Sequence, residues 1–292
     1  MLYAEKLFVD ILTDNHYQMF GPELNKENIV VAYSRGLRGT FGVSCSDCLP
    51  GLDMFCPDAT RCLALYRYDE DGERQDNLTD WGLRQFQAHY GDKKITKRDI
   101  FHYTYAVLHH PAYRAKYEIN LKRDFPRLPF YEDFRQWAKR GKALIDLHLR
   151  YEQAPPFPLT RHDRKEAANK QTDLLPDERA TPKRLLDDKP ALKPKLKADK
   201  AADIIEVDAI TTLSGIPPAA WEYKLGNRSA LEWVLDQWKE HKISDPTVAE
   251  KFNTYRFADH KEQVIDLLHR VCTVSVETMK IVNALPMLDE LK

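Results

Sequence analysis

The sequence predicts an α+β fold in which small β-rich portions surround a helical scaffold. Short β-rich runs, separated by turns that contain glycine, proline or polar residues, occupy residues 28–73. Apolar residues then recur at helical spacing over residues 79–152. Strand-like sequence returns at 203–215 and precedes two further helical patterns. Strands and helices therefore come in separate groups, which favours an α+β fold over an alternating α/β arrangement.

Residues 1–152 are expected to form a β-hairpin followed by the helical part of one domain. The runs "NIVVAYS" and "FGVSCSD" flank "RGLRGT", whose two glycines and polar residues are typical of an exposed turn. The elements expected before residue 79 are a helix over 5–20, the turn over 35–40, and strands over 28–34, 41–47 and 61–73, the last of which ends in a polar turn at Asp69–Gly72.

Capping residues mark the helices that follow. Thr79 or Asp80 can cap one helix and Thr96 the next, and Asp99 stands at the capping-box position relative to Thr96. Pro111 suits the first turn of a helix, where a missing N–H costs nothing. The helices are expected over 79–90, 96–110, 111–123 and 131–152.

The segment "LHHPAYRAKYEINLKRDFPRLPF", residues 108–130, combines histidines, aromatic residues and basic residues. His109 and His110 are adjacent on a helix and so point about 100° apart, which prevents them from sharing a metal ion. A positive charge on His109 would suit the end of the helix. The helical spacing of Tyr113 and Tyr117 indicates core packing rather than a stacking platform. The opposite, solvated face is expected to carry Arg114, Lys116, Lys122 and Arg123, with contact to phosphates as the alternative role of these residues.

The rest of the chain divides into two parts. Residues 153–200 are rich in proline and charged residues and are expected to be a polar variable linker or excursion, whose end "ALKPKLK" could form an edge strand. Residues 201–292 are expected to be the strand–turn–helix part of the same domain. There, Gly226–Asn227 marks a turn, and Ser229 with Glu232 forms a capping-box pair before a helix. A last helix is expected over 259–283.

Composition excludes several classes of protein. The chain of 292 residues has a net charge of -1, so a protein coated in basic charge is excluded, although a local basic face is not. No run of about 18 apolar residues occurs, so no membrane span is expected. The acidic residues near the start do not fit a signal peptide. These features predict a cytoplasmic protein.

Catalytic and cofactor motifs are absent from the sequence. It contains no phosphate-binding loop, dinucleotide fingerprint, zinc-protease motif or nucleophile elbow, so we expect no catalytic residues and no cofactor. Four of the five cysteines lie close together, at Cys45, Cys48, Cys56 and Cys62. The first pair has the spacing of a zinc half-site, but the second is looser. We expect no metal and keep a zinc-stabilised module as an alternative.

Two long blocks resemble the C-terminal specificity region of Type ISP restriction–modification enzymes. The first comprises "LYRYDEDGE", "DNLTDWGLRQFQAHYGDKKITKRDIFHYTYAVLHHPAYRAKYEINLKRDFPRLPF" and "GKALIDLHLRYE". The second comprises "GIPPAAWEYKLGNRSALEWVLDQW" and "VIDLLHRVCTVSVETMKIV". In that family one polypeptide carries nuclease, helicase-like and adenine-N6 methyltransferase parts followed by this target recognition domain. The resemblance implies a recognition module that binds double-stranded DNA and works with a methyltransferase/helicase polypeptide.

We expect DNA to be contacted by two exposed turns. Phosphate contacts would position the module, and a few side chains would bind base edges in the major groove. The candidate residues are Ser34, Arg35, Arg38 and Thr40 on the first turn, and Lys224, Asn227, Arg228 and Ser229 on the second. For Arg228 a structural role is the alternative, and for Arg35 and Arg38 a solvated turn. A second hypothesis makes the chain a protein-interaction remnant that docks on a separate methyltransferase or helicase subunit.

Overall fold

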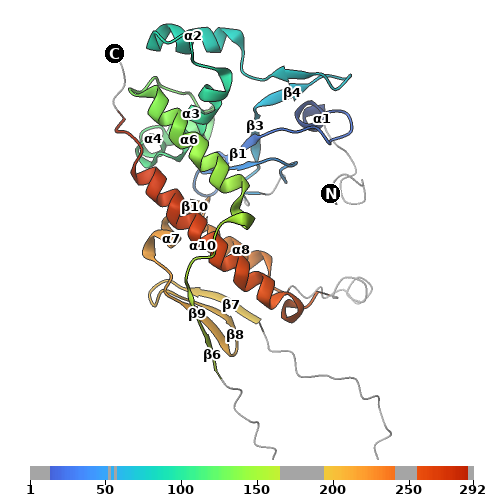
Figure 1. Cartoon of the computed structure of the whole chain (residues 1–292), viewed down its shortest axis with the longest axis vertical. Coiled ribbons are helices and arrows are strands. Elements are labelled where there is room, and N and C mark those ends of the chain that lie inside the picture. Colours follow the sequence, from blue (N-terminus) through green and yellow to red (C-terminus); the bar gives the residue numbers. More distant parts are fainter. Residues whose placement is uncertain (1–13, 52–53, 56–57, 165–193, 241–254, 289–292) are drawn as a thin grey trace, which may run out of the picture.

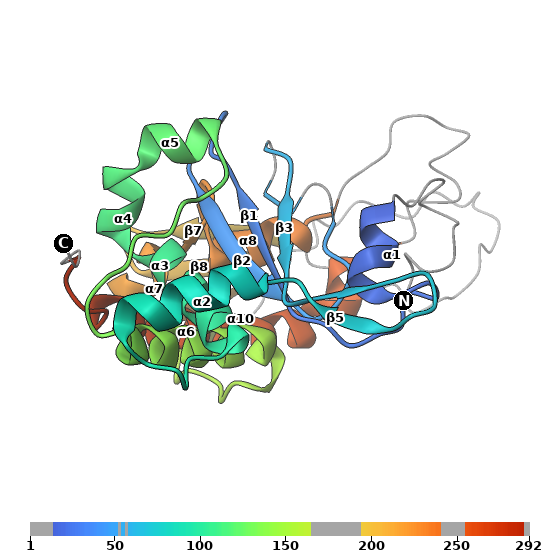
Figure 2. The same ribbon diagram turned by 90° about the horizontal axis from the view of Figure 1, so that it is seen from above.

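The first of the two main cores lies between a three-stranded antiparallel sheet and a group of helices. The computed structural model describes residues 14–51, 54–55, 58–164, 194–240 and 255–288. The sheet has the strand order β2-β1-β3, formed by β1 (Val30–Ser34), β2 (Gly42–Ser46) and β3 (Arg61–Ala64). The hairpin expected around residues 35–40 is therefore confirmed. The central strand β1 is completely buried, with helices against one face and α1 (Asp14–Phe20) near the other (Figure 2).

The polar turn expected at Asp69–Gly72 is confirmed, but the residues before it form two strands instead of one. The chain forms β3 and then a second hairpin made of β4 (Tyr66–Tyr68) and β5 (Arg74–Asp76). The turn of this hairpin is stabilised by Asp69, whose Oδ1 accepts hydrogen bonds from the backbone N–H groups of Asp71 and Glu73. Gly72 has a φ of +77° in the same turn, a conformation that favours glycine.

The helices begin where their capping residues indicate. Thr79 caps α2 (Asp80–Tyr90), which ends at Gly91 in the left-handed conformation. Thr96 caps α3 (Lys97–His109) in a capping box with Asp99. The helix α6 (Phe134–Leu149) packs along α3, and the two backbones approach closely at Gly141, where a Cβ would overlap the carbonyl oxygen of His102. The helix expected over 5–20 is described only from Asp14, because residues 1–13 lie outside the described part of the chain.

Between α3 and α6 the chain forms two short helices instead of the one expected over 111–123. Pro111 begins α4 (Pro111–Lys116) as predicted, and Nδ1 of His110 accepts a hydrogen bond of 3.2 Å from the N–H of Ala112. A second short helix, α5 (Glu118–Arg123), follows. Tyr117 separates them, with a φ of −109° and a ψ of 18° that do not continue the first helix. The helix α6 is followed by the 3₁₀ turn η1 (Tyr151–Gln153).

The second core is built on a four-stranded antiparallel sheet with the order β6-β9-β8-β7. Its strands are β6 (Thr160–Asp163), β7 (Pro194–Asp199), β8 (Ile204–Asp208) and β9 (Thr211–Ser214). The edge strand expected within "ALKPKLK" is confirmed as β7, which has Pro194 as its first residue. The strand expected over 203–215 is a hairpin, because Oδ1 of Asp208 accepts the N–H groups of Ile210 and Thr211 and turns the chain.

Both ends of the segment expected to be a linker, 153–200, therefore contribute edge strands to this sheet, and residues 165–193 lie outside the described part. The divisions at 152 and 200 stay predictions. The remaining elements are α7 (Pro218–Glu222), β10 (Lys224–Leu225), β11 (Arg228–Ser229), α8 (Ala230–Gln237), η2 (Phe257–His260) and α10 (Lys261–Asn283). Ser229 caps α8 in a capping box with Glu232, as predicted.

The long helix α10 connects the two cores, and it runs from the four-stranded sheet past α6 (Figure 1). Val264 and Leu268 are buried in the second core, whereas Val282 and Leu285, at the end of α10 and just after it, are buried in the first. Within the described ranges, no helix is both long enough and apolar enough to cross a membrane.

Candidate nucleic-acid interface

The two turns expected to contact DNA lie next to each other, although 187 positions separate Thr40 from Asn227. The backbone N–H of Thr40 donates a hydrogen bond of 2.9 Å to Oδ1 of Asn227, and the Thr40 hydroxyl lies 3.4 Å from the same oxygen. The approach is close, because a Cβ on Gly39 would lie 2.5 Å from that oxygen and one on Gly42 would lie 2.8 Å from the nitrogen of Gly226. The turns therefore form one surface.

The first turn, residues 35–41, is held from within. Gly36 has a φ of +67°, and a Cβ there would lie 2.6 Å from the backbone nitrogen of Phe41, so this position requires glycine. The backbone N–H of Arg38 donates to Oδ1 of the buried Asp58 at 3.1 Å. The backbone of the turn is thus fixed while its tip stays exposed.

Some side chains in and beside the first turn bond to the rest of the protein, and others extend into solvent. Ser34 is buried, and its Oγ accepts the N–H of Gly42 at 3.1 Å, so the expectation that it is exposed is wrong. Arg35 is half-buried and donates through Nη1 to the carbonyl of Arg123 at 3.2 Å. Arg38 is exposed, and its guanidinium makes no hydrogen bond or ion pair with any residue in the described ranges.

The second turn, residues 224–229, is a two-residue hairpin between β10 and β11. Gly226 has a φ of +70°, as expected at the first central position of a type II′ turn. Lys224 is exposed, and its ammonium group makes no ion pair with the described residues. Ser229 is fully buried as the cap of α8, so it is not exposed as expected. Its neighbour Arg228 is exposed but held in place.

The structural alternative weighed for Arg228 is supported in part. Its Nη1 pairs with the carboxylate of Asp236, and its guanidinium carbon lies 5.3 Å from the ring centre of Trp233. The indole N–H of Trp233 donates to the carbonyl of Leu225 at 2.8 Å, which ties this stack back to β10. Arg228 thus fixes the second turn, whereas Lys224 remains available for a partner.

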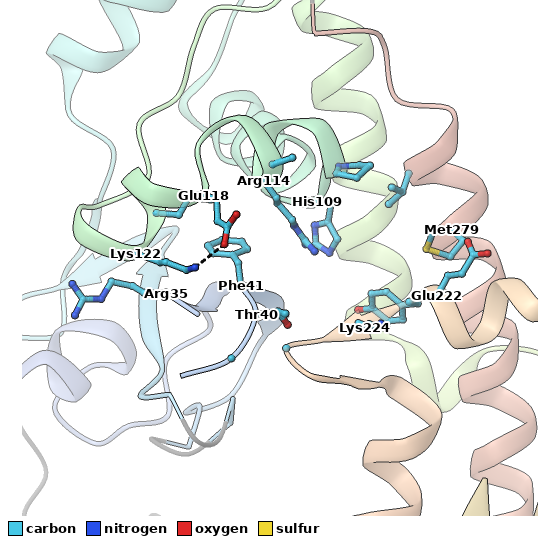
Figure 3. Close-up of a pocket in the computed structure, with 17 residues that line it drawn as sticks. Arg35, Thr40, Phe41, His109, Arg114, Glu118, Lys122, Glu222, Lys224 and Met279 are labelled. Atoms are coloured by element: carbon cyan, nitrogen blue, oxygen red, sulfur yellow. Dashed lines mark hydrogen bonds and ion pairs between the residues drawn. The ribbon is translucent and has the colours of Figure 1, made fainter. Parts of the chain in front are cut away.

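A cavity of about 390 Å³ opens between the turns and the helices behind them (Figure 3). Its wall is largely apolar, with Phe41 from the first turn, Tyr223 from the segment before the second turn, and Met279 from α10. The helices α3 and α4 contribute His109 and Arg114. The cavity therefore lies where the two cores meet, and residues far apart in the sequence close it.

Arg114 is not on a solvated face as expected. The helix α4 packs at the junction of the cores, so Arg114 is half-buried, and its guanidinium carbon lies 5.4 Å from the ring centre of Phe41. Its Nε donates to the carbonyl of Leu108 at 2.6 Å. Burial lowers the pKa of Arg114 to about 10, which leaves it positively charged at neutral pH. No carboxylate in the described ranges pairs with it.

His109 is also buried, and the positive charge expected on it is wrong. Burial and the nearby Arg114 lower its pKa well below the ordinary value, so the ring is neutral. Its Nδ1 lies 2.9 Å from the carbonyl of Tyr105 and donates to it, while Nε2 has no hydrogen-bond partner. The sequence signal for the burial of His109 is the helical spacing of Tyr113 nearby, which indicates core packing. No local pattern indicates that Tyr223 lines the same cavity as Arg114.

The cysteines do not support the zinc alternative. Cys45 pairs with Val31 and Cys62 pairs with Ala32 across β1, so the two thiols project from opposite faces of the sheet. Cys48 is exposed, and Cys56 lies outside the described residues. Throughout the part of the chain that is described, no three His, Cys, Asp or Glu side chains lie close enough to hold a metal ion.

Comparison with known proteins gives a consistent result. The matching chain in a structure of a DrdV–DNA complex has 47% sequence identity to this chain. The TM-score is 0.80, and the match covers 92% of this chain. A nuclease-deletion mutant of the Type ISP restriction–modification enzyme LlaGI, in complex with a DNA substrate mimic, is 26% identical, with a TM-score of 0.69 over 94% of this chain. The DNA-bound Type ISP enzyme LlaBIII, at 22% identity and a TM-score of 0.73 over 94%, shares the fold.

The matched regions are parts of much larger chains. The present chain spans 26%, 22% and 17% of the DrdV, LlaGI and LlaBIII chains, respectively. A search of curated proteins returns no significant match. The family model of the Type ISP C-terminal specificity domain matches residues 1–267. This chain therefore belongs to the Type ISP C-terminal specificity domain family.

Proposed function

We propose that this chain is the sequence-specific DNA recognition module of a Type ISP-like restriction–modification system and has no catalytic activity of its own. The observation that carries the proposal is the hydrogen bond between Thr40 and Asn227, which joins two distant turns into one surface. This surface presents Arg38 and Lys224, two exposed cations that no carboxylate in the described ranges neutralises. Unneutralised cations on one face are what a DNA-binding surface requires.

The side chains on this surface have different proposed tasks. Arg38 on the first turn and Lys224 on β10 are exposed and are the proposed contacts to base edges or phosphates, since an arginine can bind guanine with two hydrogen bonds. Thr40 and Asn227 fix the distance between the turns. Arg35, Arg228, Ser34 and Ser229, which make intramolecular contacts, support the shape of the turns.

The same bond supports treating the chain as one recognition unit. Residues 1–152 and 201–292 each supply one turn, so neither part presents the whole surface. In the full-length system we propose that this unit acts with a methyltransferase/helicase polypeptide, as the DNA-bound relatives suggest. A role as a protein-interaction remnant alone is not favoured, because the DrdV and LlaGI relatives are complexes with DNA.

The test requires a DNA ligand selected by the protein itself. Duplexes would be enriched from a random pool with the wild-type chain and then titrated at fixed salt with Arg38→Ala and Lys224→Ala. Arg98→Ala and Lys94→Ala are matched controls, because both residues are exposed and lie near the end of α3 opposite His109.

Each turn variant should lose about 1–3 kcal/mol of binding free energy for the selected duplex, and the controls should lose little. A relaxed preference at one base position would identify the base that the residue contacts. Affinities equal to that of the wild type in both turn variants would contradict the assignment.

A further inference from the structure

The cavity between the turns holds a cation without a counter-charge. Burying a charge is unfavourable unless a partner compensates it. Two carboxylates line the cavity: Glu118 pairs with Lys122 at 2.6 Å, and Glu222 is exposed and forms no ion pair with Arg114. The positive charge of Arg114 is therefore uncompensated within the described part of the chain.

The guanidinium of Arg114 is also fixed in orientation. Its Nε is bound to the carbonyl of Leu108, and its face lies against Phe41. The two terminal amino groups have no hydrogen-bond partner among the described residues, and the side chain points into the cavity beside His109 (Figure 3). His109 is only 4% exposed and its Nε2 also lacks a partner. The amino groups of Arg114 are donors without an acceptor, so an anion would complete them, whereas Nε2 of the neutral His109 is an acceptor and does not contribute to holding an anion.

The charges around the cavity indicate the class of ligand. Its wall has four basic side chains, Arg35, Arg114, Lys122 and Lys224, against the two carboxylates. A guanidinium offers only donors, in a planar fork that matches two oxygens of a phosphate. The apolar walls lower the local dielectric and strengthen such a contact. A pair of anionic phosphate oxygens satisfies the donors of Arg114 and compensates its charge, which a neutral base edge does not.

We propose that this cavity binds one backbone phosphate of double-stranded DNA, with Arg114 as its anchoring residue. The inference rests on the proposed function, because the cavity opens between the two turns and shares Arg35 and Lys224 with them. A duplex lying across Arg38 and Lys224 brings its backbone to the cavity mouth. A phosphate held by Arg114 contacts the junction of both cores, so it fixes the register of the duplex without reading its sequence.

The first experiment measures affinity for selected and scrambled duplexes over a series of salt concentrations. Arg114→Gln should weaken both complexes by a similar factor, leave the preference between them unchanged, and reduce the slope of log K against log salt by about 0.9, the value for one phosphate. Arg114→Lys, which keeps the charge but loses the fork, should keep the slope and weaken binding less. Thermal unfolding of each variant establishes that it is folded.

The second experiment places one neutral methylphosphonate at each backbone position in turn. One position should weaken wild-type binding far more than its neighbours, and this position should have no effect on Arg114→Gln. If Arg114→Gln does not fold, the same comparison is made with Arg114→Lys, in which the loss at that position should shrink.

Three results would overturn the proposal. One is a folded Arg114→Gln variant with the wild-type slope, and another is a methylphosphonate profile that Arg114 substitutions do not change. The third is free inorganic phosphate that raises the unfolding temperature of the wild type but not of Arg114→Gln while DNA binding is the same in both, which assigns the site to a free anion. A wild-type chain that binds no duplex at all refutes the proposed function itself, whereas binding with an unchanged slope refutes only the phosphate site.

Discussion

The contact between the two turns can be tested by a double-mutant cycle at Gly39 and Asn227. Asn227→Ala removes the oxygen that accepts the N–H of Thr40 at 2.9 Å. Gly39→Ala acts on the same bond by steric means, because the new Cβ would lie 2.5 Å from Oδ1 and 2.6 Å from Nδ2 of Asn227. Those atoms are the end of an exposed side chain, so we expect Asn227 to turn away and give up the hydrogen bond.

The magnitude follows from the number of bonds lost. Each single variant loses the backbone hydrogen bond of 2.9 Å and the longer hydroxyl bond of 3.4 Å, which share one exposed acceptor and together lower the free energy of unfolding by about 1 kcal/mol. In the double variant, Asn227→Ala has already removed the side-chain atoms that the new Cβ at position 39 would meet. Adding Gly39→Ala should therefore lower the free energy of unfolding very little further. The double variant should therefore also lose about 1 kcal/mol, which corresponds to a coupling energy of about 1 kcal/mol between the two positions.

The assay is urea unfolding, followed by tryptophan fluorescence, together with titration of the selected duplex. All three variants should show a similar loss of affinity for that duplex, because separating the turns moves Arg38 relative to Lys224. Additive losses of unfolding free energy, near twice the single value, would refute the assigned contact. So would a Gly39→Ala variant as stable as the wild type.

Two further predictions concern the core behind the turns. Gly141→Ala should lower the free energy of unfolding by about 3 kcal/mol or more in chemical denaturation, because its Cβ would overlap the backbone of His102. Gly51→Ala is the control, because a Cβ there has no atom within 4 Å, and its free energy of unfolding should change little. Burial lowers the pKa of His148 to about 3, while an unfolded histidine takes up a proton below about 6.5. Stability from this group is therefore present above pH 6.5 and falls by about 2 kcal/mol by pH 5, a loss that His148→Gln should remove; an identical pH profile in the variant would exclude the assignment.

The parts of the fold that sequence predicted correctly depend on neighbours along the chain. The capping residues Thr79, Thr96 and Ser229 mark helix starts because their hydroxyls accept hydrogen bonds from N–H groups three residues later. Gly226–Asn227 marks a hairpin turn for an equally local reason. The first strand pair, the edge strand β7 and the α+β class follow from the same short-range patterns.

The parts that could not be predicted depend on distant contacts. Ser34 is a small polar residue beside a predicted exposed turn. It is buried, because its hydroxyl accepts a hydrogen bond from the backbone N–H of Gly42 on the other side of the turn. Arg114 lies on the short helix α4, most of whose residues are exposed, but Tyr223, which lines the same cavity, is more than a hundred positions away. No local pattern carries the bond between Thr40 and Asn227.

The helix α10 explains how distant turns are kept in register. It is buried in the second core at Leu268 and in the first at Val282, and Thr278 between them bonds Nε2 of His148 on α6 at 2.8 Å. The other nitrogen of His148 bonds the hydroxyl of Tyr105 on α3 at 2.6 Å. A rigid helix fixed at both ends in this way sets the spacing of the cores, and with it the spacing of the turns that the cores carry. The proposed recognition surface is therefore a property of the whole fold, and a change in either core should alter the proposed DNA binding through the distance between Thr40 and Asn227.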